Sequence, residues 1–501
     1  MEVKNPTVKE ILRKYRRIEA ISHAENLLYW DMDTYMPKNG AEYRGDALAE
    51  LDALSQELVL DPGFVNLVRR AEGEDLNDYE KGIVRVLKRD IEYYEKLPPD
   101  FLAEMARAAT LGFQAWREAK EKADFKIFQP HLERWVEIQR KLAEYLGYEE
   151  HPYDALLDRY HEGLRYKNVK DVFSELVPFA SKFLRKVLDS GAYVPRHGLE
   201  DAEYCREDME SLNRKVLTVF GADWESFRMD VSTHPFTDGV GKGDVRITTW
   251  YHGRDFRRSL LATVHEWGHA VYESVMLDEF AYTPLHTGVS FVLHESQSRF
   301  WENHIGRSRA FVESFYEEFR RAVPALFNYT PDDVYLYFNL VRPELLRVEA
   351  DEVTYILHIA LRYELEVAML DGELPVSELP QAWNEKMEDY LGVVPPDDAR
   401  GVLQDVHWSS HSFGYFPTYA LGTVLSAQIR SAMERDLGPL EELVRERSYG
   451  PVRKWLAEKV HRFGSTFQPD VIIRRVTGEN LSPEHFISYA EERYGKIYGL
   501  K

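Results

Sequence analysis

Two histidines and a glutamate stand at the spacing H-E-x-x-H in the segment His265–His269. Residues four apart lie on one face of a helix, so His265 and His269 can hold one zinc ion through their imidazoles. Glu266 would then lie beside the metal as a general base. The same five-residue pattern also arises by chance in long sequences, without a metal. A third ligand is therefore needed to support a metal site.

The third ligand is expected on a helix that follows the motif. Catalytic zinc usually takes three protein ligands and keeps a fourth position for water. The extended pattern H-E-x-x-H-x-x-G-x-x-H fails, because Tyr272 and Val275 replace its Gly and its last His. Glu273 is only one turn past the motif and is better placed to support a ligand, and Glu279 is also near. We expect Glu295, which opens a second apolar-periodic segment; the alternative is an ordinary solvated carboxylate.

The motif sits in a sequence that favours a helix. Apolar residues flank it on both sides, and Gly268 is the only Gly or Pro between Ser259 and Leu277. Gly268 lowers helix propensity by about 1 kcal/mol relative to Ala. A small side chain there also leaves room for a substrate or a neighbouring chain segment.

The segment before this helix shows strand periodicity. Residues 227–231 and 245–249 alternate apolar and polar side chains, and a turn-rich stretch, Thr237–Gly243, separates them. We predict a small antiparallel hairpin. Three polar residues share one face of its second strand: Asp244, Arg246 and Thr248. Peptides often bind by adding to a strand edge, which favours a substrate-binding face; a purely structural hairpin is an equally good interpretation.

Helical periodicity covers nearly all of the remaining chain, and we predict a mainly α fold. The predicted helices include residues 7–29, 41–60, 75–97, 101–122, 130–146, 169–188, 201–220, 309–327, 331–340, 351–370, 379–391 and 419–433. The sequence contains no internal repeat, low-complexity tract or flexible linker.

Composition excludes several classes of function. The formal charge of −22 argues against binding to nucleic acid or anionic membranes, because both need a basic surface. The single cysteine, Cys205, rules out an intrachain disulfide and fits a reducing cytoplasm. The sequence has no run of apolar residues long enough for a membrane span, and its start does not read as a signal peptide. A charged content of 30% and one cysteine are compatible with a heat-adapted protein.

Several motifs can be compared with a known family. They read D-x-R-x-T at Asp244–Thr248, H-E-x-x-H at His265–His269, H-E-S-x-x at His294–Ser298, L-R-x-x-A-D at Leu346–Asp351 and G-x-x-Q-D-x-H-W at Gly401–Trp408. An early segment, Trp30–Pro37, reads W-D-x-x-T-x-M-P. In this order the motifs resemble those of the thermostable metallocarboxypeptidases named after carboxypeptidase Taq. The one departure is Leu346, where the family carries Ile.

The resemblance implies a large, almost all-helical single domain with a long substrate groove. Residues 1–220 would form the groove walls, 221–430 the catalytic core and 431–501 the closing helices. It also implies one Zn²⁺ per subunit, with Co²⁺ as a possible substitute, and a homodimer. The implied activity is release of single amino acids from peptide C-termini with broad side-chain tolerance.

The expected mechanism is attack by a metal-bound water. Glu266 would take the proton of the water and pass it to the leaving amine. The tetrahedral oxyanion needs a donor besides the metal. By similarity to related gluzincins such as the thimet oligopeptidases and angiotensin-converting enzyme, we expect Tyr419 with His407, and Tyr415 as the alternative. These aromatic residues could instead line a core.

An exopeptidase must also bind a free terminal carboxylate, and a guanidinium does so with two parallel hydrogen bonds. We expect Arg347 as the main anchor and Arg246 as a residue that shapes the subsite or supports the strand. Arg347 could alternatively form a helical ion pair with Asp351. Glu273 and Asp351 are candidates to orient the zinc histidines. Two other functions remain open: an oligopeptidase that cuts inside short peptides, and a non-catalytic helical binding protein.

Overall fold

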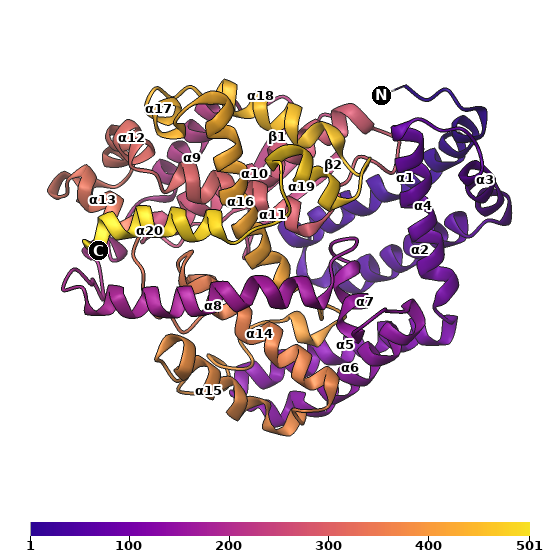
Figure 1. The fold of residues 1–501 in the computed structure, drawn as a ribbon, viewed down its shortest axis with the longest axis horizontal. Helices are drawn as coiled ribbons and strands as arrows, with labels where there is room; N and C mark the ends of the chain where they lie inside the picture. Colours follow the sequence, from indigo (N-terminus) through magenta and orange to yellow (C-terminus); the bar gives the residue numbers. More distant parts are fainter. Residues whose placement is uncertain (1, 501) are drawn as a thin grey trace.

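Helix α10 (Phe256–Phe280) lies at the centre of the fold and carries the H-E-x-x-H motif (Figure 1). The computed structural model describes residues 2–500. The helices before the sheet are α1 (Pro6–Thr34), α2 (Ala41–Val59), α3 (Pro62–Glu72), α4 (Asp78–Lys96), α5 (Pro99–Lys122), α6 (Phe125–Leu146), α7 (Pro152–Asp158), α8 (Tyr166–Asp189) and α9 (Arg206–Phe220). Those after α10 are α11 (Phe291–Arg299), α12 (Arg309–Ala322), α13 (Pro331–Phe338), α14 (Thr354–Asp371), α15 (Leu379–Leu391), α16 (Phe416–Leu437), α17 (Leu440–Arg445), α18 (Tyr449–Lys459), α19 (Pro469–Thr477) and α20 (Glu484–Tyr498).

The prediction of a mainly α fold with one small sheet is confirmed, while some helix limits differ. The helix predicted over residues 309–327 ends at Ala322, because Pro324 forces Val323 out of the helical region (φ −129°, ψ 90°). The helix predicted to begin at Pro130 begins at Phe125, with the proline inside it. None of the helices in residues 2–500 has the length and apolar character that a membrane span needs.

The small sheet has three strands rather than the predicted antiparallel hairpin. Strands β1 (Phe227–Val231) and β3 (Asp244–Thr249) pair in parallel, and β2 (Thr237–Gly241) pairs antiparallel with β3 on its other side. The prediction was wrong because the stretch Thr237–Gly243 was interpreted as a turn from its glycines, whereas its first five residues form an edge strand. The tight turn is only the step from Gly241 to Asp244.

The outer edge of β2 is covered by α1. His23 of α1 donates from Nδ1 to the carbonyl of Val240 at 2.8 Å, and Asn26 donates to the carbonyl of Gly239 at 3.5 Å. β2 also contacts α10. The strand β2 therefore lies between α1 and α10, the helix that carries the H-E-x-x-H motif.

Two clusters of buried apolar side chains hold the fold together. The large one runs through α5–α20 and the sheet, and it includes fully buried Trp135, Trp301 and Trp383. The smaller one joins α1, the end of α2, α3 and α4, and it reaches the rest of the chain through Phe280 and Leu285. Figure 1 shows these N-terminal helices grouped at one end of the molecule. The long helix α8 runs across the rest of the molecule, and α20 lies along α8.

Candidate active site

The two histidines of the motif lie on one face of α10, one turn apart. Their ring centres are 5.0 Å apart, and both side chains are about one-sixth exposed. The helix is anchored by apolar residues on its other faces, among them Leu260, Val264 and Ala270, all almost completely buried. This packing fixes the histidine face toward α11.

Glu295 of α11 meets both histidines. Its Oε2 atom lies 3.7 Å from His265 Nε2 and 3.5 Å from His269 Nε2. Ligand atoms of these three residues all lie within 4.8 Å of one another, and within residues 2–500 they form the one such group. In a tetrahedral zinc site with bonds of about 2.1 Å, neighbouring ligand atoms lie about 3.4 Å apart. The spacing of the three side chains therefore fits a single zinc-sized ion.

Two glycines let the helices come close enough for this geometry. A Cβ at Gly268 would lie 2.5 Å from the Gln297 carbonyl oxygen and from the Ser298 Cα, both on the backbone of α11. A Cβ at Gly422 of α16 would lie 2.7 Å from the Cβ of Glu295. The room that Gly268 was predicted to leave is thus filled by a neighbouring chain segment.

A buried carboxylate backs His265. Its Nδ1 atom lies 2.9 Å from Oε2 of Glu302, so with Nε2 turned to Glu295 the ring proton sits on Nδ1 and is donated to Glu302. Arg299 and Arg307 also donate to Glu302, at 3.3 and 2.7 Å. Arg307 and Arg299 hold the pKa of Glu302 well below its usual range against the effect of burial.

Sequence reasoning missed Glu302. It lies seven residues after Glu295, a spacing that returns to the same helix face after two turns and that could have pointed to it. It stands in a π-helical segment, Phe300–Gly306, that continues α11. Such segments are rare and often occur at functional sites.

His269 is backed by a second histidine instead of directly by a carboxylate. Its Nδ1 atom lies 2.6 Å from Nδ1 of His294, and Nε2 of His294 lies 2.5 Å from Oε1 of Glu273. Glu273, predicted to support a ligand, therefore reaches His269 through His294. Asp351, predicted for the same task, caps α14 instead: it accepts hydrogen bonds from the backbone of Val353 and from Thr354. The prediction for Asp351 was wrong.

Glu266 is held from the sheet. The hydroxyl of Thr237 on β2 lies 2.7 Å from Oε2 of Glu266 and 3.0 Å from its backbone carbonyl. The carboxylate is buried, and burial raises its pKa. The raised pKa and the fixed orientation suit a group that takes up a proton. Thr237 lay in the segment interpreted as a turn, so the sequence offered no sign of this contact.

A cavity of about 930 Å³ opens beside the motif. Predicted residues that line it are His265, Glu266, Glu295, Arg347, His407 and Tyr419. Its lining also includes Lys120 and Trp116 of α5, far away in the sequence. The cavity thus brings together residues of four of the five motifs.

Arg347 is engaged on all three of its nitrogens. Oδ1 of Asp405 accepts from Nε at 2.9 Å and lies 2.8 Å from Nη2 in an ion pair, and Nη1 donates to the hydroxyl of Tyr355 at 2.9 Å. The ion pair proposed with Asp351 does not form, because Arg347 opens a short 3₁₀ turn, Arg347–Glu349. Asp405 also binds the fully buried Arg362, so two guanidinium groups share one carboxylate.

His407 and Tyr419 lie at the same end of the cavity. His407 Nε2 is 3.4 Å from the Tyr419 hydroxyl, and the guanidinium of Arg347 is 5.2 Å from the centre of the Tyr419 ring. Burial lowers the pKa of His407 to about 4, so its imidazole is neutral at pH 7. Tyr415, the alternative to Tyr419, stacks edge-on against it at 5.1 Å and lies outside the cavity lining.

The other predicted substrate-binding residues lie in the sheet, outside the lining of this cavity. Arg246 donates to Asp244 at 2.7 and 2.6 Å, and its guanidinium lies over the ring of Trp30. Thr248 is fully buried and bonds to Ser232. These contacts agree with the structural interpretation of the strand face.

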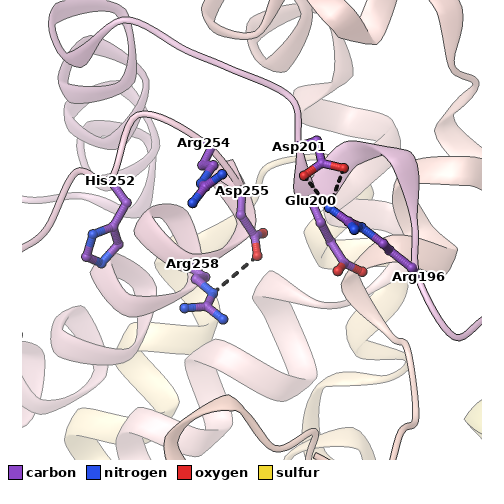
Figure 2. A pocket seen from close by; sticks show the side chains of 7 residues that line it. All are labelled: Arg196, Glu200, Asp201, His252, Arg254, Asp255 and Arg258. Carbon is purple, nitrogen blue, oxygen red and sulfur yellow. Dashed lines mark hydrogen bonds and ion pairs between the residues drawn. The ribbon is translucent and has the colours of Figure 1, made fainter.

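A smaller cavity of about 470 Å³ adjoins the large one, and the two share Arg196, Glu200, Asp255 and Arg258. Figure 2 shows its charged lining, with Arg196 bound to Asp201 and Arg258 bound to Asp255. It forms a side extension in which most charges are already paired.

The whole chain matches known metallocarboxypeptidases. A family model described as carboxypeptidase Taq (M32) metallopeptidase matches residues 10–494. Thermostable carboxypeptidase 1 of Pyrococcus furiosus is 49% identical over 492 residues, covering 98% of this chain and 99% of the relative. Carboxypeptidase 1 of Bacillus subtilis is 38% identical over 495 residues, with coverage of 98% and 99%.

Solved structures agree over the same length. The structure titled Pyrococcus furiosus carboxypeptidase Apo-Mg superposes with a TM-score of 0.97 at 48% identity and covers 98% of this chain and 99% of that one. Trypanosoma cruzi metallocarboxypeptidase 1 superposes with a TM-score of 0.92 at 33% identity, with coverage of 97% and 99%. The chain belongs to the carboxypeptidase Taq (M32) family of metallopeptidases and is a metallocarboxypeptidase.

Proposed function

We propose that this metallocarboxypeptidase uses zinc, held by His265, His269 and Glu295, to release single amino acids from peptide C-termini with broad side-chain tolerance. The observation that carries the proposal is the set of distances from Glu295 Oε2 to the two histidine Nε2 atoms, 3.7 and 3.5 Å. Two imidazoles and one carboxylate are a usual ligand set for catalytic zinc. Cobalt, which accepts the same ligands, is a possible substitute.

A zinc ion held by His265, His269 and Glu295 would supply Lewis-acid chemistry, polarising the scissile carbonyl and lowering the pKa of a water molecule. Glu266 removes the proton of the attacking water at its carboxylate and then delivers it to the leaving amine. Thr237 fixes the orientation of that carboxylate from the sheet. Glu302 and the His294–Glu273 pair keep the two histidine rings turned toward Glu295.

Other residues of the cavity lining bind the rest of the substrate. Tyr419, with His407 beside it, donates a hydrogen bond to the oxygen that becomes negative in the transition state. Arg347 binds the terminal carboxylate, and Asp405 and Tyr355 hold its guanidinium in a fixed plane. Membership of the family further supports a homodimer, and the single cysteine supports a reducing compartment such as the cytoplasm.

The test compares two short peptides of the same sequence, one with a free C-terminal carboxylate and one with a C-terminal amide. The purified protein is incubated with each, with and without a chelator, and the products are followed by mass spectrometry. We expect stepwise loss of single residues from the free acid alone, abolished by the chelator and restored by zinc or cobalt.

Two results would contradict the proposal. Internal cuts in both peptides would mean an oligopeptidase and would remove the carboxylate role of the arginines. No cleavage after zinc or cobalt is added would mean that the site is not catalytic.

A further inference from the structure

The lysine and arginine side chains that line the large cavity are, with one exception, paired with carboxylates. Within residues 2–500, each arginine of the lining has a carboxylate oxygen within 4.0 Å of a guanidinium nitrogen: Arg196, Arg257, Arg258, Arg299, Arg307, Arg342 and Arg347. Lys120 is the exception among these residues, since its ammonium has no carboxylate within that distance.

Lys120 is fixed at the cavity wall by neutral groups. It stands in the last turn of α5, its Nζ donates to the backbone carbonyl of Gln404 at 2.8 Å, and it lies 4.9 Å from the centre of the Trp116 ring. Trp116 in turn donates from its indole to the carbonyl of Leu403 at 3.0 Å. The side chain is half-buried, and burial lowers its pKa while Asp405 acts in the opposite direction.

The charges around Lys120 leave this end of the cavity positive. Asp405 is the acidic group that acts on the ammonium, and it already binds both Arg347 and Arg362. Asp405 thus pairs with two guanidinium groups and also acts, from beyond ion-pair distance, on the Lys120 ammonium. A half-buried ammonium that keeps donor protons free is satisfied when an anionic group enters the cavity.

A carboxypeptidase substrate always brings one such group, its terminal carboxylate. Arg347 has one free N–H on each of its terminal nitrogens after its bonds to Asp405 and Tyr355. We propose that Lys120 of α5 binds the substrate's terminal carboxylate together with Arg347. This rests on the proposed function. It also assigns a substrate contact to the N-terminal helices, 227 positions before Arg347 in the chain.

The alternative is that Lys120 only ties α5 to Gln404, or stabilises the helix end as a cation. Lys120→Gln separates these roles, because glutamine keeps an N–H donor for the Gln404 carbonyl and loses the charge. Lys120→Arg keeps the charge. Lys122→Gln is the matched control, since Lys122 lies in the same helix turn, is 60% exposed and pairs with Glu118.

The experiment measures kcat and KM on free-acid peptides that end in a neutral residue, and on the same peptides ending in Asp or Glu. We expect Lys120→Gln to raise KM about 10- to 100-fold for every free-acid peptide, the loss that a charge-assisted hydrogen bond implies. We expect kcat to change less than about threefold, Lys120→Arg to restore most of the affinity, and Lys122→Gln to behave as the unmodified enzyme.

Three outcomes overturn the assignment. An unchanged KM in Lys120→Gln means that the residue is a tether. A KM that rises only for peptides ending in Asp or Glu means that Lys120 faces the last side chain. If Lys120→Gln lowers kcat without changing KM, and Lys120→Arg does not restore kcat, the substitution has displaced the Gln404–Asp405 segment and Lys120 has only a structural role. Failure of the proposed function is distinct, because the unmodified enzyme would then cleave amidated and free-acid peptides equally.

Discussion

The hydroxyl of Thr237, on the edge strand β2, lies 2.7 Å from Oε2 of Glu266 on α10.

 The edge strand β2 thereby fixes the orientation of the carboxylate on α10, and the same hydroxyl lies 3.0 Å from the Glu266 backbone carbonyl. Of the contacts described above, this is the one that joins the sheet to the proposed general base.

Thr237→Val should lower kcat about tenfold and leave KM and metal content unchanged. Valine keeps the shape of the side chain and removes the donor, so the carboxylate of Glu266 loses its fixed orientation. Steady-state kinetics on a free-acid peptide measure this effect, with Thr237→Ser as the control that keeps the hydroxyl. A kcat within twofold of the unmodified enzyme would show that Thr237 does not position Glu266.

Gly268→Ala should weaken metal binding and lower stability by about 1–3 kcal/mol. The added Cβ would meet the backbone of Gln297 and Ser298 at 2.5 Å, so α11 and its Glu295 must move. Gly45→Ala is the control, because a Cβ there meets nothing within 4 Å and the helix should gain about 0.5–1 kcal/mol. Zinc titration and urea unfolding measure the two effects. Equal zinc affinity in both variants would contradict the argument.

Glu302→Gln should reduce zinc affinity about 10- to 100-fold, because Glu302 accepts directly from His265. Glu273→Gln should reduce it less, since Glu273 reaches His269 only through His294. Competition with a zinc-binding dye measures both affinities, and circular dichroism checks that each variant is folded. The opposite order of the two losses would show that the histidine chain matters more than the direct carboxylate.

Arg347→Ala should raise KM for free-acid peptides at least about tenfold, because a charge-assisted contact to the terminal carboxylate is lost. Arg246→Ala should leave KM nearly unchanged, since Arg246 lies in the sheet and pairs with Asp244. Kinetics of both variants on one peptide compare the two arginines. If Arg246→Ala gave the larger rise, the strand face would be the substrate-binding surface.

Glu366→Gln should flatten the pH dependence of stability. Glu366 is fully buried on α14, and burial raises its pKa from 4.5 to about 7. The folded protein therefore holds this proton more tightly, and the contribution to stability is complete below about pH 4.5 and is lost as pH rises through about 7. The full effect is at most about 3 kcal/mol.

Urea unfolding at pH 5 and pH 8.5 checks this prediction. The difference in unfolding free energy between the two pH values should be about 2–3 kcal/mol smaller in Glu366→Gln than in the unmodified protein. Glu373→Gln, at an exposed position, is the control and should change nothing. Parallel pH profiles in all three proteins would mean that Glu366 is ionised in the fold across this range.

Sequence reasoning reached the parts of the site that local spacing determines. The four-residue step from His265 to His269 fixes a helix face, and the predicted Glu295 is brought to that face. Glu302 was missed although it lies seven residues after Glu295, because spacing along one segment does not show that its carboxylate meets His265 on another. Contacts between distant segments could not be derived either, since periodicity does not say which helix packs on which.

Strand pairing in the sheet could not be predicted from the sequence either. Alternation correctly located β1 and β3, but it cannot tell a parallel pair from an antiparallel one. The glycines at 239 and 241 made the β2 segment look like a turn. The strand lies between α1 and α10, and its contacts with these two helices stabilise it. Lys120 likewise reads as one of many helix-surface lysines until α5 is placed against Gln404.

The covering of β2 by α1 restricts how a peptide can be oriented in this enzyme. The carbonyls of Gly239 and Val240 already accept hydrogen bonds from Asn26 and His23, so a peptide could join that edge as a fourth strand only by displacing α1. In the proposed mechanism, Arg347 would then set the direction of the substrate chain at its end, by charge, instead of along its backbone. An enzyme built this way would read where a peptide stops and be indifferent to most of what precedes it.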